Sequence, residues 1–154
     1  MTGTIDTRLA ELSITLPDAP APAANYVPFV QSGNLVFVSG QISQGPDGLI
    51  KGRLGDDMDV AAGAQAAHAC GLSLIAQARA ACGGDLDRVM RVVKLTGFVN
   101  STPDFIDQPK VINGCSDLMV AVFGAAGRHA RAAVSANSLP LGVAVEIEAV
   151  FELR

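Results

Sequence analysis

The segment 143–153 constrains the fold most, because apolar and acidic residues alternate along it. Neighbouring side chains of a strand point to opposite faces of the sheet. One face would carry Val143, Val145, Ile147, Ala149 and Phe151, and the other Glu146, Glu148 and Glu152. We expect helices to cover the apolar face. The glutamate face should lie away from them, exposed in a monomer or facing another subunit in an oligomer.

Two helices are predicted to cover this sheet. Asp59 is suited to cap a helix over residues 60–82, which Gly83-Gly84 ends. The second begins near Asp107–Pro109, where proline is tolerated in the first turn, and continues to about Gly124. Small and apolar residues recur along the first helix at helical spacing and allow close approach to a sheet: Val60, Ala64, Ala67, Gly71, Leu74, Ile75 and Ala78.

The rest of the chain supplies strands and connections. We expect a short helix over 6–14, an extended proline-rich arm over 17–28, strands over 34–39, 88–100, 129–138 and 143–153, and turns at 45–48 and 139–142. The 154 residues suit one domain. The most economical arrangement is an α+β fold with two helices on one face of a mixed sheet.

Composition excludes several classes of protein. A net charge of −4, one tyrosine and no tryptophan argue against a dedicated nucleic-acid binder. Residues 1–12 lack the apolar core of a signal peptide, and no apolar run approaches the roughly 18 residues of a membrane span, so a cytoplasmic location is expected. The hydrophobic fraction of 49% suggests that another subunit covers part of the surface.

Cysteines and histidines offer no metal site. Cys70, Cys82 and Cys115 form no C-x-x-C pair, which favours three reduced core residues over a disulfide framework or a zinc ribbon. His68 and His129 lack metal-ligand spacing. The chain also contains no G-x-G-x-x-G, P-loop or G-x-S-x-G motif.

Arg131 is the strongest candidate for a functional residue. It shares a strand face with Ala133, Ser135 and Asn137, which leave its guanidinium free to bind a carboxylate through two hydrogen bonds. The alternative is a surface arginine paired with a glutamate, and the spacing alone supports both equally.

Glu146 is the nearest candidate acid or base in the sequence. A hairpin centred near 140–141 would place Arg131 opposite residue 150. Glu146 would then lie four residues away along the partner strand, which corresponds to roughly 13 Å. We therefore expect that a ligand or a second chain bridges the gap. The alternative for Glu146, a solvated strand face, is the one that the residue pattern alone favours.

Three segments together resemble one known family. They are A-R-A-A-V-S-A-N-S-L-P-L-G-V-A-V-E-I-E at 130–148, N-L-V-F-V-S-G-Q-I at 34–42, and Tyr26, thirteen residues before Ser39. This combination resembles the YjgF/RidA family, the reactive intermediate deaminases, also labelled endoribonuclease L-PSP. The resemblance covers about residues 20–154 of the single domain 1–154. Residues 1–19 look like an extension found in one branch of the family.

The resemblance implies a fold and an assembly. The fold would be α+β and chorismate mutase-like, with a mixed six-stranded sheet and two helices on one face. Three chains would form a homotrimer whose sheets enclose a central barrel, with sites in the clefts between subunits. A second chain could then close the gap between Arg131 and Glu146.

The resemblance also implies an activity, hydrolysis of small 2-imino acids to 2-oxo acids and ammonia. Arg131 would hold the substrate carboxylate, and Glu146 would position water and transfer protons. Tyr26, Ser39 and Gly40 would line the pocket, and backbone groups of Gly40 and Ala133 would help to hold the water. No metal or organic cofactor is implied, and the partners would be a small carboxylate metabolite and two further copies of the chain.

Three positions depart from the family pattern. Ala133 replaces a cysteine found in many deaminases, His129 a proline or small residue, and Asn137 a small or basic residue. Two alternatives therefore stand beside the deaminase: a non-catalytic protein that binds small carboxylates, and an endoribonuclease or translation inhibitor. The acidic balance of charge argues against the last.

Overall fold

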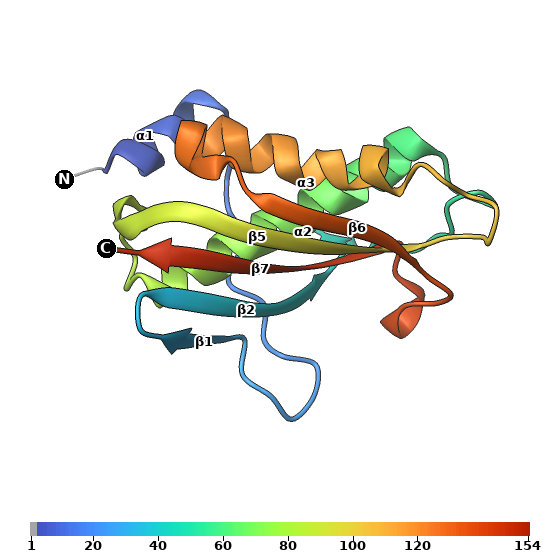
Figure 1. Ribbon diagram of the computed structural model, residues 1–154, viewed down its shortest axis with the longest axis horizontal. Coiled ribbons are helices and arrows are strands. Elements are labelled where there is room, and N and C mark those ends of the chain that lie inside the picture. The colour runs from blue at the N-terminus through green and yellow to red at the C-terminus, as the bar shows by residue number, and fades with distance from the viewer. Residues whose placement is uncertain (1–2) are drawn as a thin grey trace.

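Both long helices form where the sequence predicts them. The computed structural model describes residues 3–154 and contains α2 at Val60–Ala81 and α3 at Gln108–Phe123. The Asp59 side chain accepts a hydrogen bond from the Ala62 N–H at 2.8 Å and caps α2, as expected. Helix α2 contacts β2 and β7, whereas α3 contacts β5 and β6. Figure 1 shows α2 behind the strands.

The main sheet has five strands, fewer than the six predicted. It consists of β1 (Phe29–Ser32), β2 (Leu35–Ile42), β7 (Val145–Leu153), β5 (Val89–Asn100) and β6 (Ala130–Ala136), in that order across the sheet. The two short strands β3 (Gln44–Gly45) and β4 (Gly48–Leu49) form a separate hairpin. Strand β1 was not predicted. The α+β class and the mixed sheet are confirmed.

The predicted hairpin between the last two strands is wrong. Strand β5 lies between β6 and β7, pairing in parallel with β6 and antiparallel with β7. The reason is α3, which connects β5 to β6 and returns the chain in the same direction, as a strand–helix–strand crossover does. The connection from β6 to β7 then passes over one end of β5, through the 3-10 turn Pro140–Gly142.

The two faces of β7 are those that the alternation predicts. Val145, Ile147 and Phe151 have no exposed surface, whereas Glu148 is exposed. Because directly paired residues share a face, the register carries this division across the sheet. The helix-free face also displays the exposed apolar side chains Val30, Phe37 and Val134.

The N-terminal part of the chain lies across the helix side. Helix α1 spans Thr4–Glu11, shorter than the predicted 6–14, and the Asp87 carboxylate accepts 2.9 Å hydrogen bonds from the Thr4 and Ile5 N–H groups. These two donors lower the pKa of Asp87. The arm, residues 17–28, contains no helix or strand, as predicted. In Figure 1 it passes behind the sheet and loops out beside β1.

The three cysteines are reduced core residues, as predicted. Cys70, Cys82 and Cys115 are all free and buried. Burial raises the pKa of the Cys115 thiol to about 12, so this group stays protonated at neutral pH. None of the helices within residues 3–154 is both long and apolar enough to cross a membrane.

We predict that Gly114→Ala lowers the free energy of unfolding. A Cβ at Gly114 would collide with the Ala64 carbonyl of α2 and lie 3.0 Å from the Ala64 Cα. Alanine favours a helix over glycine by about 1 kcal/mol, but forcing α2 and α3 apart costs roughly 1–3 kcal/mol. Urea titration measures the net effect, and a more stable variant would contradict the close helix crossing.

Candidate active site

One extra residue interrupts the pairing of β2 with β7. Val38 pairs with Ala149, but the next paired residue of β2, Gln41, pairs with Ile147. Three steps along β2 therefore match two along β7, which is a β-bulge at Ser39–Gly40. A bulge changes the phase of the alternation and redirects the side chains that follow it.

Gly40 leaves room for the carboxylate of Glu146. A Cβ at this position would lie 2.6 Å from Glu146 Oε2. Any larger residue would therefore push the carboxylate away. The S-G-Q-I segment and the glutamate of β7, distant in sequence, are in this way brought into direct contact.

Three predicted site residues line one cavity. Tyr26, Gly40 and Glu146 border a space of about 490 Å³ between the arm, β2, β4 and the turn before β7. Ser39 holds the arm against the strand instead. Its Oγ donates to the Val27 carbonyl at 2.7 Å and its N–H donates to the Pro28 carbonyl at 2.9 Å. The remaining lining is mostly apolar: Pro20, Ala21, Pro22, Ala23, Ala24, Pro28, Gln41, Ile42, Gln44, Leu49, Pro140 and Leu141.

The electrostatic setting of Glu146 favours its protonated form. The carboxyl group is half-buried, and none of the salt bridges formed within residues 3–154 involves it. Burial is the first cause that raises its pKa, and the nearby charge of Glu148 is the second. A raised pKa makes a carboxylate a stronger base, which suits a group that accepts a proton and then returns it.

Arg131 lies on the opposite face of the sheet. It pairs with Leu95, whose side chain is buried on the helix side. Its Nη1 donates to Asn113 Oδ1 at 2.8 Å and to Ser116 Oγ at 3.2 Å, both on α3. Among the described residues no carboxylate lies within salt-bridge distance, so the alternative of a surface ion pair is wrong within one chain.

Arg131 and Glu146 therefore do not meet within one chain. Strand β5 lies between them, which places them two strand spacings, roughly 10 Å, apart across the sheet. Arg131 is level with Ala149 rather than Glu146, so three residues, roughly another 10 Å, separate them along the strands, and they point to opposite faces. The expected separation of Arg131 from Glu146 is therefore confirmed, although the hairpin from which it was predicted does not form. Ala133 shares the face of Arg131 and packs partly against the core, away from the cavity.

Two partners of Arg131 were not predicted. Asn113 and Ser116 lie three residues apart on α3, and His129 also hydrogen-bonds to Ser116 Oγ at 2.9 Å. Residues three positions apart on a helix lie on the same face, but nothing in the sequence indicates that this face of α3 meets the edge strand β6. Only the parallel placement of β6 brings them together.

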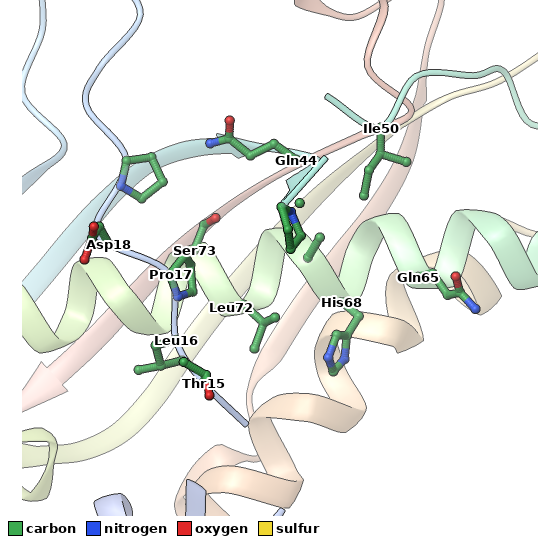
Figure 2. A pocket seen from close by; sticks show the side chains of 14 residues that line it. Thr15, Leu16, Pro17, Asp18, Gln44, Ile50, Gln65, His68, Leu72 and Ser73 are labelled. Carbon is green, nitrogen blue, oxygen red and sulfur yellow. The ribbon is translucent and has the colours of Figure 1, made fainter. Parts of the chain in front are cut away.

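A larger cavity lies elsewhere. It measures about 840 Å³ and is bordered by the arm, α2 and the β3–β4 hairpin. Figure 2 shows Pro17, Leu72 and Ile50 around it, with His68 and Gln65 projecting from α2. It contains none of the predicted site residues. Within residues 3–154, no group of three or more His, Cys, Asp or Glu side chains is placed to hold a metal.

Comparison with known proteins establishes the family. The model of the family described as "YjgF/chorismate_mutase-like, putative endoribonuclease" matches residues 6–153. Protein TCP17 of Trypanosoma cruzi is 50% identical over an alignment of 154 positions that covers 99% of this chain and 96% of that protein. The chain therefore belongs to the YjgF/RidA family.

Solved structures agree with this assignment to different degrees. Atu1372 of Agrobacterium tumefaciens is 48% identical with a TM-score of 0.89, covering 97% of this chain and 94% of the other. RidA of Psychrobacter sp. is 28% identical with a TM-score of 0.59, covering 88% and 94%. The backbone thus resembles Atu1372 more closely than RidA.

We predict that Glu146→Gln stabilises the protein at neutral pH. The folded-state pKa of Glu146 is raised, so ionising this group costs stability above that pKa. The cost disappears as pH falls, and below about pH 4 the carboxyl is protonated in both states. Urea titrations at several pH values should show the gain at pH 7 and lose it in acid. Asp117→Asn, at an exposed acid of α3, is the control for net charge.

Proposed function

We propose that this protein hydrolyses small 2-imino acids to 2-oxo acids and ammonia, at a site that two copies of the chain form together. The observation that carries the proposal is the placement of Glu146. It is a half-buried acid beside Gly40 in a cavity that Tyr26 also lines. RidA, whose name refers to this class of deaminase, is among the similar structures.

The proposed reaction uses one proton-transfer group and one anion-binding group. The Glu146 carboxylate takes a proton from water while the oxygen attacks the imine carbon and forms a carbinolamine. With the imine nitrogen protonated at the start, this carbinolamine is neutral. Glu146 then returns the proton to nitrogen, and the C–N bond breaks as the hydroxyl oxygen forms the C=O bond. The ionised Glu146 carboxylate takes up the hydroxyl proton and passes it to the departing ammonia, which leaves as ammonium. Arg131 of a second copy would bind the substrate carboxylate through two hydrogen bonds and hold the imine carbon in place.

The helix-free face of the sheet supports an assembly. On this face Val30, Phe37 and Val134 are 53%, 47% and 44% exposed, and they lie on three different strands of the sheet. Apolar side chains spread in this way favour an interface with another subunit. A homotrimer with the sheets facing a common axis would cover them and bring further copies of the chain to the cavity. We propose that this trimer works in the cytoplasm, as the three free cysteines suggest.

A non-catalytic binding protein is the second candidate. Ala133 takes the place of a cysteine found in many deaminases, and the cavity beside Glu146 could hold a small acid without converting it. This alternative predicts that 2-oxo acids raise the melting temperature while 2-imino acids are not consumed any faster. An endoribonuclease is disfavoured by the net charge of −4.

We expect the wild-type protein to accelerate the release of pyruvate from 2-iminopropanoate, generated from alanine with an amino-acid oxidase. Glu146→Gln removes the proton-transfer group and should lower kcat/KM by roughly 10²-fold or more. Arg131→Ala should lower it mainly by raising KM. Arg128→Ala, at an exposed arginine nearby, is the matched control. No acceleration by the wild type, or full activity of Arg131→Ala, would contradict the proposal.

Mixing two inactive variants tests whether the site is shared. If Arg131 and Glu146 come from different subunits, a trimer with both variants contains some sites in which both residues are intact. Co-refolding Arg131→Ala and Glu146→Gln in equal amounts should restore roughly a quarter of the wild-type activity, from random assembly of a cyclic trimer. A site within one chain would recover none. A monomer by light scattering would equally exclude a shared site.

A further inference from the structure

The arm forms one wall of the cavity, and before its end at Val27 and Pro28, which Ser39 holds, few hydrogen bonds fix it to the rest of the fold. Within the described chain, residues 15–26 make one hydrogen bond to another element. In that bond the buried side-chain amide of Gln77 donates to the Pro20 carbonyl at 2.7 Å. Residues 21–27 are all exposed. Figure 2 shows the arm crossing α2 beside Ser73, one helical turn before Gln77.

Gln77 is also the start of a chain of buried hydrogen bonds. The side chain is only 1% exposed, in a helix otherwise packed by small and apolar residues. Its amide also donates to Gln41 Oε1 at 3.4 Å, and Gln41 Nε2 donates to the Ser39 carbonyl at 2.9 Å. Gln41 faces inward because the bulge shifts the alternation of β2, so that Val38 and Gln41 are both buried.

This chain of hydrogen bonds connects the two ends of the arm. Ser39, at its far end, holds Val27 and Pro28 through its own hydroxyl and N–H groups. The path therefore runs from Pro20 through Gln77, Gln41 and Ser39 back to the arm. Tyr26 lies within the segment thus closed, and its hydroxyl oxygen accepts a hydrogen bond from the Ala23 N–H at 3.3 Å.

We propose that Gln77 is a positioning residue for the cavity of Glu146 and Tyr26, acting through the arm rather than on the substrate. Its effect on turnover rests on the proposed function, whereas its effect on the arm does not. Without the amide, Pro20 has no anchor and the wall that carries Tyr26 moves outward. The bulge and Glu146 remain in place, because β2 and β7 hold them by backbone pairing. Substrate binding should therefore suffer much more than the chemical step.

Tyr26 provides a direct measurement of the arm. It is the single tyrosine of a chain without tryptophan, so intrinsic fluorescence reports on this residue. In Gln77→Met, which keeps the side-chain length and loses both N–H donors, we expect more efficient quenching of Tyr26 by acrylamide. KM for the imino acid and Kd for pyruvate should each rise about tenfold, the factor that one neutral hydrogen bond contributes to an equilibrium, with kcat within about twofold of wild type.

Gln65→Met makes the same chemical change at an exposed position of α2 and should leave all three measurements at wild-type values. If Gln77→Met does not fold, Gln77→Leu, a good helix former that also lacks the donors, should show the same changes. Quenching and pyruvate affinity equal to those of Gln65→Met would overturn the proposal, as would a fall in kcat with KM unchanged. A looser arm in a protein without any turnover would support the positioning role and refute the deaminase.

Discussion

Burial of one face of β7 beneath α2 is the constraint on which the site depends. Val145, Ile147 and Phe151 must face the helices, since their apolar surface contributes to the core. The alternation of the strand then places Glu146 on the other face, whatever its own preference. Its partial burial, its raised pKa and its contact with Gly40 follow from a position that the core dictates. The acid is therefore held by rigid backbone pairing rather than by a loop.

The position of Arg131 is fixed in a similar way by the parallel pairing of β6 with strand β5. Because α3 returns the chain parallel to β5, β6 becomes the outer strand, and Arg131 lies between its edge and α3. The two candidate catalytic groups are consequently divided between the two faces and separated by the central strand. One chain therefore presents the two groups at separate places, and under the proposed function a complete site would require groups from more than one chain.

The sequence was informative wherever a local pattern matched a regular element. Asp59 capped α2, and the alternating residues of β7 took the expected faces. The family resemblance, rather than a local pattern, grouped Tyr26 and Gly40 with Glu146, and the three lie around one cavity. The sequence was misleading about β6 and β7, because a short connection between two strands suggests that they pair with each other. In the structure both strands pair with β5, which lies between them. Asn113, Ser116 and Gln77 were missed for a related reason. Their partners are distant in sequence, and no periodicity signals a single polar contact.

By itself, then, the sequence determined the helices, most of the strands, the face on which each residue of β7 lies, and the family. The elements and the faces of β7 are properties of near neighbours, which backbone geometry and hydrophobic periodicity control directly. The family follows from three motifs taken together. The tertiary structure decided that β5 separates Arg131 from Glu146, that a bulge turns Gln41 inward, and that the arm closes the cavity. Such features depend on which surfaces distant in sequence pack together, and this packing is determined by the side chains of the whole core rather than by any one segment.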